Sequence, residues 1–168
     1  MSYADHFRLA DDFIVHLDAS IGGIADQFIR SRYVGFVAIS AATVYELAVK
    51  EIFLSFAAKK HKVLGNFAQG YFDRISGQIG MKRIVEIYLP LFGEKYADRF
   101  IKNLDVVELS SLKSDNVSVK SSYSNLLTWR HSFAHEGMIS GNATYDEVKK
   151  SYQYGCRLIH CLDKSMRR

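Results

Sequence analysis

The sequence predicts an all-α protein. Its 168 residues include a single proline, and proline is the residue that most strongly interrupts helices. Long windows repeat apolar residues at spacings of three and four, which is the period of an amphipathic helix. No segment sustains the alternation of apolar and polar residues that is typical of a half-buried strand. A chain of this length is expected to form one domain over residues 1–168, with a core that needs neither metals nor disulfides.

Two helices are expected in the first third of the chain. The first spans about Tyr3–Arg30 and is expected to kink at Gly22-Gly23. Its core-facing residues recur at helical spacing and are Phe7, Ala10, Ile14, Leu17, Ile21, Ile24 and Phe28. The second contains no charged residue over Tyr33–Tyr45 and carries apolar residues around most of its circumference. This pattern predicts a central helix surrounded by others.

The middle of the chain is expected to form short helices followed by a loop. Apolar stripes between residues 66 and 104 are interrupted by glycines and by Pro90, and the first stripe consists of Phe67, Tyr71 and Ile75. Such short helices are expected to pack across one end of the molecule. Asp105–Asn116 is rich in serine and aspartate and is predicted to be a loop.

Two longer helices are expected to close the chain. One begins near Val117. Thr144 and Glu147 have the spacing of a capping box, in which each side chain accepts a hydrogen bond from the other residue's backbone N–H, so the last helix is predicted to begin near Tyr145. Its core face comprises Tyr145, Val148, Tyr152, Ile159, Leu162 and Met166.

Composition favours a soluble cytoplasmic protein without a membrane partner. No window reaches about 18 uncharged apolar residues, and the first residues lack the basic start and apolar centre of a signal peptide. Cys156 and Cys161 lie on a predicted helix, too far apart around it for an easy bridge, and two thiols fit a reducing compartment. The net charge of +4 favours polyanionic partners only slightly.

The chemistry of the chain is concentrated in residues 129–137. Arg130, His131 and His135 lie close together in an otherwise apolar helical segment. At about 100° per residue, the two histidines lie about 40° apart on one face, and the long stem of Arg130 can close part of its larger separation from His135. Gly137 suits the left-handed position just past a helix end, so His135 is predicted to open onto a loop.

The segment Arg130-His131-Ser132-Phe133-Ala134-His135 resembles the Arg-x4-His signature of the HEPN superfamily, the higher eukaryote and prokaryote nucleotide-binding domains. The arrangement around the motif also resembles HEPN proteins, over roughly the whole chain. The motif lies near the end of a penultimate helix, a Gly-rich loop follows it, and an amphipathic helix closes the chain. The resemblance implies an HEPN-like antiparallel bundle of four to five main helices with short accessory helices. It also implies a homodimer with a composite active site, because a two-fold interface brings identical residues together.

The function implied is a metal-independent endoribonuclease that cleaves single-stranded RNA through attack by the RNA's own 2′-hydroxyl. Arg130 would neutralise the phosphate oxygens, since a guanidinium is a planar bidentate donor. His135 would act as general base or acid, because imidazole exchanges protons near neutral pH. His131 would orient the phosphate or share the proton transfer. No cofactor or metal is expected, and the resemblance is consistent with a toxin–antitoxin or defence role in which an antitoxin protein is a partner.

Supporting residues are proposed with alternatives for each. Glu46 is the first charge on the central helix and is expected to hold Arg130, as acidic or polar residues on this helix do in HEPN proteins; the alternative is a surface pair with Lys50. Weak RNA-binding candidates are Lys59, Lys60 and Lys62 at a helix end and Lys149 and Lys150 on the last helix. The alternative for each of these lysines is a solvated helix face.

Three other interpretations of the motif stay open. In the first, Arg130 is a buried structural residue tied to Glu46 or to a backbone carbonyl, and the two histidines beside it only satisfy the packing. His131 and His135 at i,i+4 can share a metal with Glu136 nearby, although the order differs from the His-Glu-x-x-His of metalloproteases. A non-catalytic HEPN module that binds nucleotide, RNA or a partner protein through the same cleft is the main alternative to the ribonuclease.

Overall fold

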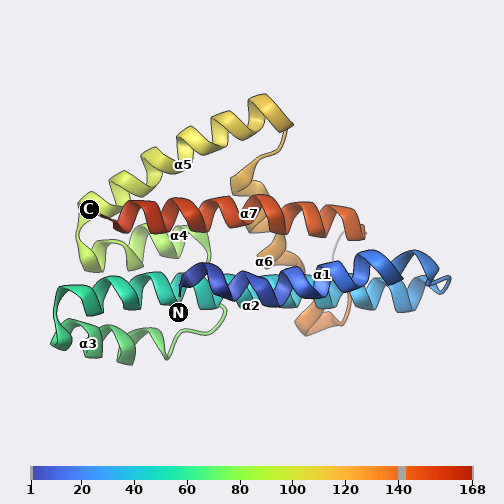
Figure 1. Ribbon diagram of the computed structural model, residues 1–168, viewed down its shortest axis with the longest axis horizontal. Coiled ribbons are helices and arrows are strands. Elements are labelled where there is room, and N and C mark those ends of the chain that lie inside the picture. Colours follow the sequence, from blue (N-terminus) through green and yellow to red (C-terminus); the bar gives the residue numbers. More distant parts are fainter. Residues whose placement is uncertain (1, 140–142, 168) are drawn as a thin grey trace.

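The computed structural model describes residues 2–139 and 143–167, and within these residues it contains helices and no strand (Figure 1). This confirms the all-α class that the sequence predicts. Residues 140–142 of the expected Gly-rich loop lie outside the described residues. The elements in chain order are η1 Tyr3–Phe7, α1 Arg8–Ser20, η2 Ile21–Gly23, α2 Gln27–Lys60, α3 Lys62–Phe72, α4 Met81–Arg83, η3 Ile84–Tyr88, η4 Pro90–Phe92, α5 Glu94–Asp115, α6 Val119–Glu136 and α7 Tyr145–Met166.

Helix α2 is the axis of the molecule. In Figure 1 α1 runs antiparallel to both α2 and α7, α6 crosses this group, and α5 slopes away from it. Tyr45 of α2 stacks on Tyr123 of α6 and on Tyr152 of α7, with ring centroids 5.2 and 5.8 Å apart. The Tyr45 hydroxyl donates to the Tyr152 carbonyl at 2.5 Å, and burial raises the pKa of Tyr45 well above its ordinary value. This aromatic cluster joins three long helices at one point.

The predicted first helix is two helices. The chain leaves α1 at Ser20, forms a short 3-10 turn over Ile21–Gly23, and starts α2 only after Asp26, whose carboxylate accepts from the backbone N–H groups of Phe28 and Ile29. Paired glycines lower helix propensity enough to favour a break rather than the expected kink. Phe28, predicted to be buried, belongs to α2 and is 63% exposed.

The predicted loop at Asp105–Asn116 is helical. Helix α5 continues to Asp115 and ends at Asn116, whose left-handed φ of 52° is a common helix end. The serines and acids there indicate a loop, but Leu104 and Ser111 stay buried at helical spacing. The side-chain hydroxyl of Ser111 also donates to the Val117 carbonyl at 2.7 Å, which ties the end of α5 to the start of α6.

The short helices of the middle segment are present, but the first of them faces outward. In α3 the buried residues are Ala68 and Phe72, whereas Phe67 and Tyr71 are 74% and 37% exposed. Of the predicted inward stripe of Phe67, Tyr71 and Ile75, only Ile75 is buried. The central helix is also less enclosed than predicted, because Phe36 and Leu47 are 51% and 37% exposed.

The last helix agrees with its prediction. Thr144 and Glu147 form the capping box, α7 begins at Tyr145, and all six predicted core residues are buried. Cys156 and Cys161 are free thiols. No helix in residues 2–139 and 143–167 is long and apolar enough to cross a bilayer, and a cytoplasmic location stays a prediction.

Candidate active site

Helix α6 carries the motif and is fixed at both ends. At its start the Ser118 hydroxyl accepts from the Ser121 N–H at 3.0 Å, and Glu108 of α5 accepts from the Ser118 hydroxyl and the Lys120 N–H at 2.5 and 3.0 Å. At its end Gly137 adopts a φ of 69° and donates to the Phe133 carbonyl at 3.0 Å. The predicted helix end after His135 is therefore present, and it follows from the left-handed backbone that glycine permits.

Two aromatic side chains of α6, Tyr123 and Phe133, hold this helix against its neighbours. Tyr123 is fully buried, and its hydroxyl donates to the Ile79 carbonyl at 2.7 Å. Phe133 packs edge-on to Phe36, with ring centroids 5.5 Å apart, and lies directly over Gly35. A Cβ at Gly35 would lie 2.1 Å from the Phe133 ring, so this close approach of the two helices requires glycine.

Arg130 borders a cavity of about 300 Å³ between α2, α6 and the segment that follows α3. The cavity is lined by Ala42, Thr43, Glu46, Leu47, Ser76, Gly77, Ile79, Leu127, Arg130 and His131. Arg130 is half-buried, and its guanidinium forms no hydrogen bond or ion pair within the part of the chain that the structure describes. A half-buried cation without a protein partner is suited to a ligand anion.

Gly77 forms the wall opposite the guanidinium. Its φ is 66°, and a Cβ there would lie 3.1 Å from Arg130 Nη1. Both the backbone conformation and the space therefore favour glycine. The sequence does not mark Gly77 as part of the site, because a glycine in a loop is usually only a turn former and the approach of Arg130 is a tertiary contact.

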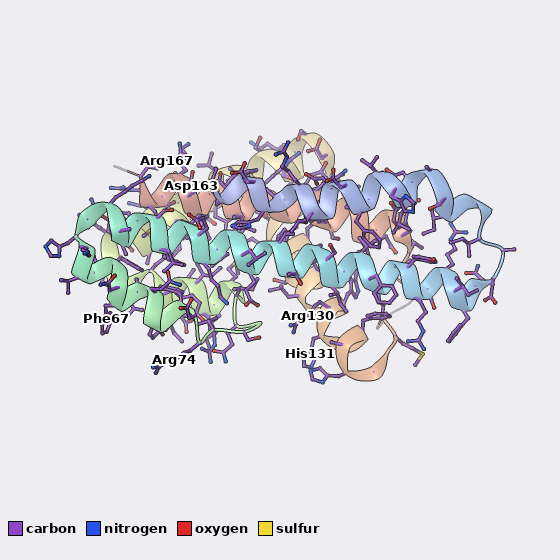
Figure 2. The ribbon with its side chains drawn as sticks, turned by 60° about the horizontal axis from the view of Figure 1, so that its bottom comes forward. Phe67, Arg74, Arg130, His131, Asp163 and Arg167 are labelled. Atoms are coloured by element: carbon purple, nitrogen blue, oxygen red, sulfur yellow. The ribbon has the colours of Figure 1, made fainter. Side chains whose placement is uncertain are left out.

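The two motif histidines form a pair on the exposed side of α6. The ring centroids of His131 and His135 are 4.4 Å apart with an interplanar angle of 54°, in agreement with the helical spacing. His131 also lines the cavity of Arg130, whereas His135 is not among its lining residues and lies one turn nearer the end of α6. Figure 2 shows Arg130 and His131 projecting from the same edge of the molecule. The two histidines are thus adjacent and exposed, and His131 shares the cavity with the half-buried Arg130.

Glu46 lines the same cavity but does not pair with Arg130. Its carboxylate accepts from Lys50 Nζ at 2.8 Å and from the Gly77 N–H at 2.6 Å. The predicted direct contact between Glu46 and Arg130 is therefore wrong. Glu46 pairs with Lys50, one turn further along α2, because the Lys50 ammonium is closer to the carboxylate than the arginine is. Glu46 instead holds the backbone of Gly77, which lies against the Arg130 guanidinium. Its support for Arg130 is indirect.

We expect Glu46→Gln to lower the free energy of unfolding by about 1–2 kcal/mol, because hydrogen bonds to charged groups are stronger than neutral ones. Glu86→Gln is the matched control, since Glu86 has the same i,i+4 spacing from Lys82 but is 59% exposed and 3.9 Å from it. The control should change stability by less than about 0.5 kcal/mol. Urea unfolding measures both, and equal small losses would mean that the Gly77 contact contributes nothing.

The candidate RNA-binding lysines are not gathered at this cavity. Lys59 and Lys60 lie at the end of α2, where Lys60 Nζ stands 4.9 Å from the Phe56 ring centre, and Lys62 begins α3. Lys149 is paired with Asp18 at 2.5 Å, and Lys150 lies over Tyr154. The fold separates these five lysines from the motif because they belong to other helix ends and faces.

No group of three or more histidine, cysteine, aspartate or glutamate side chains suited to a metal ion occurs in residues 2–139 and 143–167. His131 and His135 are close enough to share a ligand, but Glu136 and other acids do not complete a cluster with them. The site thus consists of one guanidinium, two imidazoles, and a glycine wall held by Glu46.

Comparisons with known proteins agree with this arrangement. The family model described as RiboL-PSP-HEPN matches residues 3–167. No curated protein and no solved structure shows significant similarity to the chain. The matched residues include the whole bundle, the cavity and the Arg-x4-His motif of α6. The chain therefore belongs to the RiboL-PSP-HEPN family of the HEPN superfamily.

Proposed function

We propose that the protein is a metal-independent endoribonuclease that cleaves single-stranded RNA. The observation that carries the proposal is the Arg130 guanidinium, which is half-buried and forms no hydrogen bond or ion pair with the described residues. It borders a cavity of about 300 Å³ that His131 also lines, and the rings of His131 and His135 have centroids 4.4 Å apart. A phosphodiester supplies the anion that this guanidinium lacks, and the imidazoles supply groups that accept and donate protons.

The proposed reaction divides the work between the three side chains. His135 removes the proton of a ribose 2′-hydroxyl, and the 2′-oxygen attacks the adjacent phosphorus. The bond to the 5′-oxygen breaks, and that oxygen takes a proton from a protonated imidazole of the site, leaving a 2′,3′-cyclic phosphate and a 5′-hydroxyl. Arg130 neutralises the charge that grows on the non-bridging oxygens, and His131, which lines the cavity, orients the phosphate or shares the proton transfer.

The proposal includes a two-fold homodimer with a composite site. Ile29, Phe36 and Leu47 lie on one face of α2, because seven or eleven residues bring a helix back to the same side, and they are 46%, 51% and 37% exposed. Leu47 lines the Arg130 cavity and Phe36 contacts α6. A second copy that covers this apolar face would bring a second motif next to the first. Light scattering distinguishes such a dimer from the 19.1 kDa monomer.

The proposal is tested by digestion of a single-stranded RNA with purified protein in excess EDTA. We expect cleavage to persist in the chelator and to leave 2′,3′-cyclic phosphate ends, while the DNA of the same sequence stays intact because it lacks the 2′-hydroxyl. RNA that is bound but not cut would make the protein a non-catalytic binding module. A toxin–antitoxin or defence role with an antitoxin partner stays a prediction of the family resemblance.

A further inference from the structure

Helix α3 presents its apolar side to solvent. Val63, Leu64, Phe67 and Tyr71 are 67%, 37%, 74% and 37% exposed, and Phe67 is the most exposed large apolar side chain in the described residues. The inward residues Ala68 and Phe72 already fill the contact with the core. Phe67 is therefore free for an outside partner, whereas the Tyr71 ring is held edge-on against Phe72 at 5.3 Å.

An unpaired arginine follows this helix. Arg74 is exposed, and it forms no ion pair or hydrogen bond within residues 2–139 and 143–167. Its neighbour Asp73 accepts instead from Gln69 at 2.6 Å, so the nearest carboxylate in sequence is already occupied. The result is an exposed phenyl ring and a free guanidinium on one short stretch of chain.

This stretch leads directly to the candidate active site. Arg74 precedes by three residues Gly77, the glycine against which Arg130 packs, so the Cα atoms of Arg74 and Gly77 are at most about 11 Å apart. In Figure 2 the labelled side chains of Phe67, Arg74, Arg130 and His131 all project along the same lower edge of the molecule, and α1 lies along the opposite edge. All four side chains therefore lie on one side of the molecule, in the order Phe67, Arg74, Arg130 and His131.

We propose that Phe67 and Arg74 form a binding track for the single-stranded RNA that flanks the cleaved bond. A base stacks on the Phe67 ring, a backbone phosphate pairs with Arg74, and the next nucleotides enter the Arg130 cavity. This assignment rests on the proposed ribonuclease function, and it specifies which residues contact the RNA strand outside the cavity. Aromatic rings combined with unpaired cations are the elements that bind single strands without reading their sequence.

The surface also has features of a protein-docking site, since Val63 and Leu64 continue the apolar stripe. Two observations favour RNA over a protein partner. The guanidinium of Arg74 is unpaired near the most exposed ring, and the stretch shares its edge with a second unpaired guanidinium, Arg130. Two free cations that follow an aromatic ring along one edge fit the repeating charge of a nucleic-acid backbone better than an apolar helix.

The test measures binding of a short fluorescein-labelled single-stranded DNA by anisotropy, because stacking and phosphate contacts do not need the 2′-hydroxyl and this strand cannot be cut by the proposed reaction. Phe67→Ala and Phe67→Leu should each weaken binding about tenfold, while Phe67→Trp keeps it, since a base stacks on a ring and not on an isobutyl group. Arg74→Ala should weaken binding and lower the slope of log affinity against log salt by about 0.7.

Matched controls come from α1. Leu9→Ala removes a side chain that is 63% exposed, and Arg8→Ala removes an exposed arginine without a described partner; neither should change binding. The four substitutions at Phe67 and Arg74 alter exposed side chains, so their melting temperatures should match that of the wild type. If Phe67→Leu binds like the wild type while Phe67→Ala does not, base stacking is refuted.

The binding and cleavage experiments distinguish failure of the proposed binding track from failure of the proposed ribonuclease function. Wild-type DNA binding that depends on Phe67 and Arg74, together with uncut RNA, would retain the track and remove the catalytic function. Unchanged binding in the Phe67 and Arg74 variants would remove the track even if RNA is cut. If Phe67→Ala instead lowers the mass measured by light scattering, the stripe on α3 is an interface between protein chains and the track is refuted.

Discussion

Arg130→Ala and His135→Ala will each reduce cleavage of single-stranded RNA by at least about 100-fold, the lower range for loss of a general acid–base group. The two residues are expected to act as one unit, so removal of either loses nearly the same rate. His131→Ala should be a partial loss if this residue only orients the phosphate. Initial rates on a labelled RNA, with the cyclic-phosphate product as readout, measure all three.

These substitutions should leave the fold intact, which separates catalysis from stability. Arg130 has no hydrogen-bond partner in the described chain and both histidines are exposed, so no buried group loses its partner. Arg8→Ala and His16→Ala on α1 are controls of the same residue types at exposed positions, and both should cut RNA at the wild-type rate. If the Arg130→Ala protein is as active as the wild type, the role proposed for Arg130 in stabilising the phosphate is refuted.

Gly35→Ala should lower the free energy of unfolding by about 2–3 kcal/mol and the melting temperature by roughly 5–10 °C. The added Cβ would lie 2.1 Å from the Phe133 ring, so the ring must leave its position or α2 and α6 must separate. The direction of the change in stability is informative, because glycine-to-alanine substitution at an open helical position is stabilising. Calorimetry or circular dichroism on heating gives both quantities.

Gly70→Ala is the control for Gly35. Gly70 lies inside α3, and a methyl group added there would have nothing within 4 Å, so the substitution should gain about 0.5–1 kcal/mol. Combining Gly35→Ala with Phe133→Leu should recover part of the loss, since the shorter side chain makes room for the methyl group. Additive losses in the double variant would mean that the Phe133 ring is not what Gly35 accommodates.

Local signals in the sequence predict the elements whose ends depend on local chemistry. The capping box at Thr144 and Glu147 and the left-handed Gly137 act within a few residues, so the start of α7 and the end of α6 are where they are expected. The helical continuation through residues 105–115 is not predicted, because its serines resemble a loop while the tertiary contacts that bury Leu104 and Ser111 are not visible in the sequence.

In the candidate site, too, contacts within one helix are predicted from the sequence and contacts between distant segments are not. The pairing of His131 with His135 follows from i,i+4 spacing on one helix and is present. The contact of Glu46 with Gly77, and that of Gly77 with Arg130, join segments 31 and 53 residues apart in the chain, and no local pattern encodes them. Roles in catalysis stay predictions for Arg130, His131 and His135.

The aromatic content of α6 also gives the molecule an optical property. Trp129 is the only tryptophan of the chain, is half-buried, and immediately precedes Arg130. Tryptophan emission from this protein therefore originates entirely from the helix that bears the motif. Events that change the solvent around α6, such as occupation of the cavity or approach of a second copy, alter the intrinsic fluorescence without any attached label.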